Sequence, residues 1–124
     1  MPELKKYQMF IDGQWVDSDT KKTFETLNPE NNKPWAVVPE ASANDVDRAV
    51  KAAQKAFEGG WPKMIARDRA KYLRAIGNKL RENSELLGKI ETIDTGKLYR
   101  ETYQQAKYIA EYLSLIHISE PTRH

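Results

Sequence analysis

The chain has 124 residues, of which 40% are hydrophobic and 31% are charged, and its net charge is +2. These values are typical of one soluble globular domain or part of one, and they exclude a disordered polymer, an acidic tail and a strongly basic nucleic-acid module. Cysteine is absent and histidine occurs only at His117 and His124, which excludes a disulfide scaffold, a thiolate zinc site and a thiol nucleophile in this chain.

The N-terminal part of the sequence predicts short β-strands joined by tight turns. Asp12-Gly13 lies between two short apolar runs in residues 9–16, which is a strong signal for a two-residue hairpin turn. Residues 23–27 predict a strand that an Asn-Pro step ends, and residues 34–39 predict a second strand after a polar turn. We therefore expect β-ribbons at the front of the fold.

From residue 42 onward, apolar residues recur at the spacing of amphipathic helices. Ser42 and Asp45 form a capping-box-like start, and Gly59-Gly60 ends the first helix. Gly96 stands where a left-handed C-terminal residue belongs. The expected helices cover about 42–58, 65–81, 84–95 and a segment from 99 to at least 110.

Each expected helix has an apolar face that needs a covering partner. The third helix, for example, carries Leu86, Leu87, Ile90 and Ile93 at helical spacing. Such helices normally lie on a sheet, yet the sequence has only short edge-type strands and no continuous Val/Ile run of a buried parallel sheet. The pattern predicts an incomplete α/β domain in which short β-hairpins precede three to four amphipathic helices.

No familiar nucleotide, zinc or membrane motif is present. The glycines fit neither the dinucleotide-binding nor the Walker spacing. No apolar run approaches the roughly 20 residues needed to cross a bilayer, and the N-terminus lacks the apolar core of a signal peptide. From these two observations we expect no membrane partner and a cytoplasmic location. Because Lys and Arg are interleaved with Asp and Glu, we expect no nucleic-acid partner either.

One acidic residue stands where the helix dipole disfavours it. Asp94 is placed in the last turn before Gly96, at the negative end of the third helix. Either of two positively charged groups would offset the unfavourable interaction of the Asp94 carboxylate with the helix dipole. One is Lys97, three residues further on, and the other is a bound hard cation, which prefers carboxylate and carbonyl oxygens. The residues alone leave both open.

Four short segments occur in a fixed order, with sequences Phe-Ile-Asp-Gly-Gln-Trp-Val, Thr-Phe-Glu-Thr-Leu-Asn-Pro, Asp-Val-Asp-Arg-Ala-Val and Glu-Thr-Ile-Asp-Thr-Gly-Lys. They occupy residues 10–16, 23–29, 45–50 and 91–97. Together they resemble the N-terminus of the NAD(P)-dependent aldehyde dehydrogenase superfamily, in the manner of betaine-aldehyde-dehydrogenase-like members. The last segment is the most specific, because it is similar to the family's Glu-Thr-x-Asp-x-Gly-Lys pattern.

The resemblance implies an N-terminal fragment of a longer oxidoreductase with a Rossmann-like cofactor-binding domain, which oxidises an aldehyde to a carboxylic acid with NAD or NADP. In that family a cysteine thiolate attacks the aldehyde and a glutamate activates water for hydrolysis of the thioester. Both would lie beyond residue 124, so we assign no catalytic and no cofactor-binding residue here. We expect the fragment to be inactive alone, and its parent to be a homodimer or homotetramer.

The resemblance also implies one site within this chain. Many family members bind potassium or sodium through two successive backbone carbonyls and the Asp of the Glu-Thr-x-Asp segment. The matching residues here are Thr26, Leu27 and Asp94. This expectation agrees with the unusual position of Asp94 at a helix C-terminus.

The C-terminus departs from the family pattern, since residues 113–124 resemble a translated transposon-end sequencing adapter. Both histidines lie inside this segment. We therefore expect residues 1–112 to be an incomplete N-terminal part of the cofactor-binding domain and residues 113–124 to be a non-native tail. The alternative to the hypothesis of an N-terminal fragment is a stand-alone helical module that binds a protein partner through its apolar faces.

Overall fold

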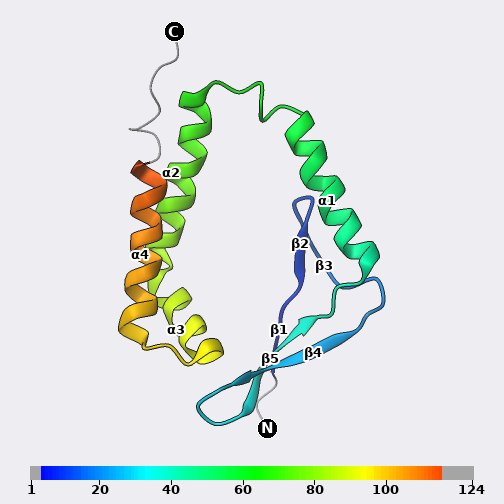
Figure 1. The fold of residues 1–124 in the computed structure, drawn as a ribbon, viewed down its shortest axis with the longest axis vertical. Coiled ribbons are helices and arrows are strands. Elements are labelled where there is room, and N and C mark those ends of the chain that lie inside the picture. The colour runs from blue at the N-terminus through cyan, green and yellow to red at the C-terminus, as the bar shows by residue number, and fades with distance from the viewer. Residues whose placement is uncertain (1–3, 116–124) are drawn as a thin grey trace. The chain divides into compact units, whose positions relative to one another are not determined.

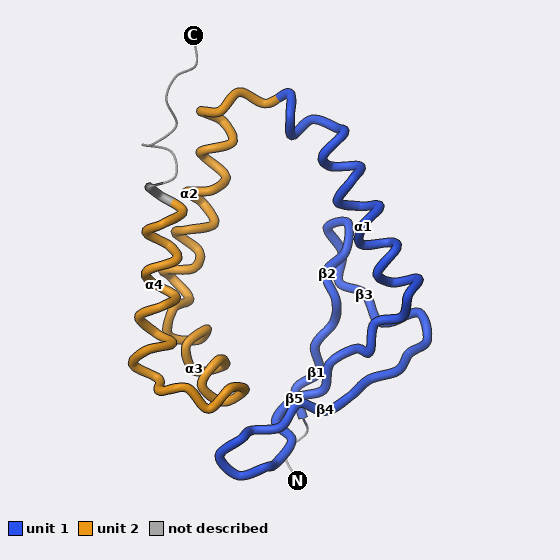
Figure 2. Tube along the Cα trace, viewed as in Figure 1, with its two compact units in different colours: residues 1–63 blue, residues 64–124 orange. Residues whose placement is uncertain are grey.

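The computed structural model describes residues 4–115, which form short strands followed by four helices (Figure 1). This order confirms the prediction of short β-ribbons ahead of three to four helices. The chain divides into two compact units, residues 1–63 and residues 64–124 (Figure 2). The strands and the first helix belong to the first unit, and the other three helices belong to the second.

The strands of the first unit form a three-stranded sheet of order β1-β5-β4 and a separate two-stranded hairpin, β2-β3. β5 is antiparallel to β4 and parallel to β1. The sequence did not predict β1, because two consecutive lysines show no apolar alternation. The strand bounds are β1 (Lys5–Lys6), β2 (Met9–Ile11), β3 (Gln14–Val16), β4 (Thr23–Asn28) and β5 (Lys33–Pro39).

The predicted hairpin turn is confirmed. Asp12 and Gly13 both have positive φ, 52° and 77°, as a two-residue turn that matches the strand twist requires. The register places Phe10 opposite Trp15, with their ring centroids 5.0 Å apart. Both rings remain largely exposed.

Helix α1 (Ala43–Glu58) begins where the sequence predicted. The Ser42 hydroxyl accepts from the Asp45 N–H at 3.1 Å, and the Asp45 side chain accepts in turn from the Ser42 N–H, which completes a capping box. The alanine-rich face of α1 lies beside Phe10 and Ile11 of the hairpin.

The second unit is a group of three helices, α2 (Ala66–Glu82), α3 (Ser84–Thr95) and α4 (Tyr99–Leu115). α4 packs against both α2 and α3. The contacts are close, since a Cβ built on Gly77 would lie 2.9 Å from the Ala110 carbonyl oxygen. None of the helices within residues 4–115 combines the length and the apolar character needed to cross a bilayer.

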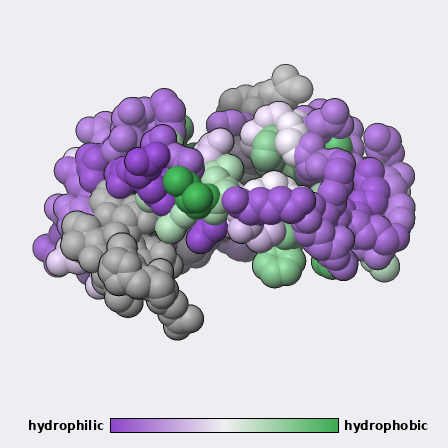
Figure 3. Space-filling view, turned by 90° about the horizontal axis from the view of Figure 1, so that it is seen from above, coloured by the Kyte–Doolittle hydropathy of each residue, from purple (hydrophilic) through white to green (hydrophobic). Residues whose placement is uncertain are grey.

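The core of both units is built from small residues. Among residues 4–115, the buried hydrophobic residues are the alanines Ala36, Ala70 and Ala110. Large apolar side chains remain exposed, with Phe57 at 72% and Trp15 at 67%. In the space-filling view of Figure 3, apolar green surface accordingly lies open among the purple hydrophilic residues. The predicted apolar faces are therefore present and largely uncovered within each unit.

Candidate functional site

Two of the three residues predicted to bind a cation lie next to a β-bulge. Thr26 of β4 is paired with Ala36, whereas the following residue, Leu27, is paired with Pro34, so Trp35 is the extra residue of β5. Pro34 has no N–H to donate to the ladder. The register of the β4–β5 ladder thus shifts between the two residues whose carbonyls the family resemblance implies as cation ligands.

The third residue, Asp94, lies in the last turn of α3 and is exposed. Gly96 follows with φ 75°, and its N–H donates to the Thr92 carbonyl at 2.9 Å, which confirms the predicted left-handed helix end. Lys97 is one of the two partners for Asp94 that the sequence left open. Its ammonium group donates to Glu91 Oε1 at 2.7 Å. Thr26 and Leu27 are neighbours in the first unit and Asp94 belongs to the second, so the cation site stays a prediction.

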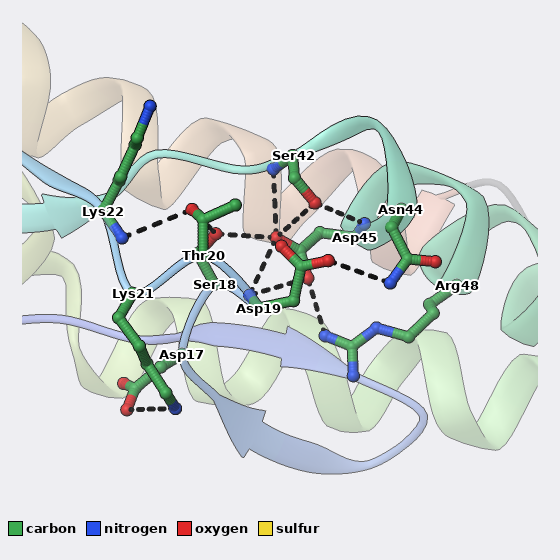
Figure 4. Close-up of polar contacts among 10 residues, drawn as sticks. All are labelled: Asp17, Ser18, Asp19, Thr20, Lys21, Lys22, Ser42, Asn44, Asp45 and Arg48. Carbon is green, nitrogen blue, oxygen red and sulfur yellow. Dashed lines mark hydrogen bonds and ion pairs between the residues drawn. The ribbon is translucent and has the colours of Figure 1, made fainter.

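A second cluster surrounds Asp45 at the start of α1 (Figure 4). Asp45 is buried, with only 1% of the residue exposed. The Ser18 hydroxyl and the Ser42 N–H donate to Asp45 Oδ2 at 2.8 and 3.0 Å. The Asp19 N–H lies 3.3 Å from both carboxylate oxygens, and the Arg48 guanidinium donates to Oδ1 at 2.7 Å. The carboxylate therefore joins the loop after β3 to the N-terminus of α1.

These donors hold the pKa of Asp45 well below its ordinary value. The largest cause is the Ser42 backbone N–H, and the Ser18 hydroxyl, the Asp19 N–H and Arg48 add to it, while desolvation acts in the opposite direction. Because the group stays ionised at neutral pH and all its contacts are internal, it is an anchor and not a proton-transfer group. The sequence predicted the cap of this helix but not the contact with residues 18–19.

A third cluster connects α3 and α4 through a buried threonine. Thr102 is 0% exposed, and its hydroxyl donates to the Gly88 carbonyl at 2.9 Å. It also lies 3.0 Å from the Thr92 hydroxyl. At Gly88 an added Cβ would lie 2.9 Å from the Tyr103 nitrogen. The cluster fixes the close approach of two helices and offers no free reactive group.

The first unit also has a surface cavity of about 500 Å³. Its lining supplies ammonium, hydroxyl and carboxylate groups, and the carboxylate of Asp17 already accepts from Gln8 at 2.9 Å and pairs with Lys21 at 3.6 Å. Within residues 4–115, no three acidic or imidazole side chains gather as a metal-binding group. The lining residues are Lys6, Tyr7, Gln8, Asp17, Ser18, Lys21, Lys22, Thr23, Val37 and Pro39.

Comparison with known proteins explains this absence of a recognisable reaction centre in the described residues. The family model named "Aldehyde dehydrogenase family" matches residues 15–119. "Aldehyde dehydrogenase family 2 member C4" of Arabidopsis thaliana is 42% identical over 101 residues, which cover 81% of this chain and 20% of the relative. The chain spans about a fifth of the length of the first curated relatives it matches.

Solved structures give the same result. Betaine aldehyde dehydrogenase from Staphylococcus aureus, solved in complex with NAD+, has a TM-score of 0.84 and 38% identity, covering 89% of this chain and 22% of that one. NAD-dependent aldehyde dehydrogenase from Sinorhizobium meliloti has a TM-score of 0.88 and 31% identity, covering 93% of this chain and 23% of that one. By sequence and by fold, this chain belongs to the aldehyde dehydrogenase family.

Proposed function

We propose that this chain is the N-terminal portion of an enzyme that oxidises an aldehyde to a carboxylic acid with NAD+ or NADP+. The observation that carries the proposal is the family match over residues 15–119, together with the fold shared with two NAD-linked aldehyde dehydrogenases. By the same resemblance, we propose that the parent enzyme is a cytoplasmic homodimer or homotetramer.

Residues 1–124 are proposed to be inactive when they are isolated. The reaction that the family resemblance implies begins with a cysteine thiolate, and the sequence contains no cysteine. The polar clusters at Asp45 and Thr102 are engaged in internal hydrogen bonds. The matched structures are also much longer, since this chain covers 22% or 23% of their length.

A monovalent cation site at the Thr26 and Leu27 carbonyls and the Asp94 carboxylate remains part of the proposal. The chemistry of the donors supports it, because carbonyl and carboxylate oxygens are the ligands that hard cations prefer.

Residues 113–124 are proposed to be a non-native, adapter-derived tail that follows an incomplete domain of residues 1–112. Residues 116–124 of this tail lie outside the described residues, and α4 continues to Leu115. The nucleotide sequence of the source DNA tests this directly. Codons for residues 113–123 that differ from those of the adapter contradict the adapter origin, and so does an authentic homologous gene that continues with these same residues.

Catalysis is tested with two proteins. Purified 1–124 is incubated with a panel of aldehydes and NAD+ or NADP+, and the absorbance of the reduced nicotinamide is followed. No rate above the protein-free blank is expected. In a chimera, residues 1–112 replace the matching segment of the Staphylococcus aureus betaine aldehyde dehydrogenase, and NAD+-dependent oxidation is expected to return. Turnover by 1–124 alone contradicts the proposal, as does a folded chimera without activity.

A further inference from the structure

Helix α2 is strongly basic. Its 17 residues include six lysines and arginines but only two acids, Asp68 and Glu82. Asp68 is paired with Lys71 at 2.8 Å, and Glu82 is paired with Lys79 at 2.8 Å. Six basic residues against two acids leave this helix with an excess of four positive charges.

Four of the six basic residues share one side of α2, which we call the basic face. The second, third and fourth of them follow the first by four, seven and fourteen positions, which is the spacing of a single helical face. All four are exposed. The buried small residues Ala70 and Gly77 lie on a different side of the helix, where Gly77 closely approaches the α4 backbone. The basic face consists of Arg67, Lys71, Arg74 and Arg81.

The order of charges along the chain does not reveal this face. Acidic and basic residues are interleaved in the sequence, and that interleaving predicts no nucleic-acid partner. In the helix, however, Asp68 follows Arg67 by one position and is therefore rotated away from it by about 100°. Helical winding thus separates charges that are adjacent in the sequence, and a row of cations remains on one side.

We infer that the basic face of α2 binds the phosphate backbone of double-stranded DNA, independently of base sequence. This inference does not depend on the proposed catalytic function. From Arg67 to Arg81 the row extends about 21 Å along the helix axis. Because a DNA duplex carries one negative charge per roughly 1.7 Å of its axis, such a row meets several phosphates at once. Three of the four cations are arginines, whose planar guanidinium group binds phosphate through two parallel hydrogen bonds.

An acidic peptide and a lipid surface fit the basic face less well. A peptide would have to be ordered along the helix at a cost in conformational entropy, whereas a DNA duplex is already stiff. A helix that binds a bilayer presents apolar side chains to the same membrane that its cations contact. The exposed large apolar residues of α2, Tyr72 and Ile76, lie on the side opposite the basic face. The face therefore suits a rigid polyanion.

Binding is tested by the fluorescence anisotropy of a labelled DNA duplex of about 20 base pairs, titrated with 1–124 at several KCl concentrations. Four phosphate contacts predict a slope of about −3.6 for the logarithm of the binding constant against the logarithm of the salt concentration. The affinity should therefore fall about 100-fold between about 50 and 200 mM KCl. In the triple variant Arg67→Gln/Arg74→Gln/Arg81→Gln, the slope should change to about −1 and the affinity at about 50 mM KCl should fall at least tenfold.

The matched control removes three charges from exposed lysines of the first unit, through Lys33→Gln/Lys51→Gln/Lys55→Gln. It should keep the slope of the unmodified chain, because none of these lysines belongs to the basic face. A control that loses as much affinity as the triple variant shows that only net charge matters and overturns the inference. Absence of duplex binding by 1–124 at about 50 mM KCl overturns it as well.

Two further measurements complete the test. If circular dichroism shows that the triple variant has lost helix content, Arg74→Gln takes its place, and a slope that this single change does not reduce by about one contradicts the inference. Polyglutamate and vesicles containing phosphatidylserine are titrated in the same way. Tighter binding of 1–124 to either of them than to the duplex assigns the basic face to a different class of partner and overturns the inference.

Discussion

Replacing Gly88 with alanine should destabilise the second unit even though alanine is the better helix former. The added methyl carbon would lie 2.9 Å from the Tyr103 nitrogen, 3.0 Å from its Cα and 3.3 Å from its Cβ. Two of these atoms are backbone atoms, so α4 has to move away as a whole. The displacement also stretches the 2.9 Å hydrogen bond from the Thr102 hydroxyl to the Gly88 carbonyl.

The magnitude follows from three opposing contributions. Overpacking a close contact costs about 1–3 kcal/mol, and a weakened buried hydrogen bond adds about 1 kcal/mol. The higher helix propensity of alanine relative to glycine stabilises the folded state by about 1 kcal/mol. The net expectation is a destabilisation of about 1–3 kcal/mol, in which the steric contribution outweighs propensity.

Urea unfolding of 1–124, followed by far-ultraviolet circular dichroism, measures this difference. The matched control is Gly60→Ala, because no atom lies within 4 Å of a Cβ at Gly60 and its φ is not in the left-handed region. That control should leave the midpoint unchanged or raise it slightly. A Gly88→Ala protein as stable as the unmodified chain would refute the close approach of α3 and α4.

Two further predictions concern Asp45 and Asp94. The pKa of Asp45 is lowered in the folded state, so its stabilising contribution is complete above about pH 5 and is lost progressively as the pH falls below that. Asp45→Asn should therefore reduce the loss of stability of 1–124 between about pH 5 and pH 3, with a residual slope from Asp19, whose pKa is also lowered. Equal acid sensitivity in both proteins would argue against the Asp45 anchor. For the cation site, KCl should raise the thermal midpoint of the chimera above that in choline chloride of equal ionic strength, and Asp94→Asn should remove the difference. No difference between the two salts in the unmodified chimera would count against bound potassium.

Local signals allowed the elements themselves to be predicted from the sequence. Asp12-Gly13 indicated the hairpin because few residues accept positive φ at both positions of the turn, and the structure has 52° and 77° there. Ser42 and Gly96 marked a helix start and a helix end through capping groups that act within one turn of the chain. Each of these signals depends only on residues that are close in sequence.

Contacts between distant residues could not be predicted in the same way. The hydrogen bond from Ser18 to Asp45 joins residues 27 positions apart, and no spacing rule relates a loop serine to a capping aspartate. The bulge at Trp35 depends on the register of two strands, which becomes visible only when Leu27 is paired with Pro34. The cation residues were indicated by family resemblance and by the position of Asp94, not by a local motif of metal ligands.

Helical periodicity shows where the apolar residues of a helix lie, but not which side its neighbour will occupy. In α3 the period indicates the stripe containing Leu86, Ile90 and Ile93, while α4 occupies the opposite side, with Gly88 at its centre. A unit that had evolved to fold alone would gain most by burying the large residues, because stabilisation scales with the apolar area removed from water. Burying the small side instead leaves the large residues for a different contact. This choice of side favours a part of a larger aldehyde dehydrogenase over a self-sufficient helical module.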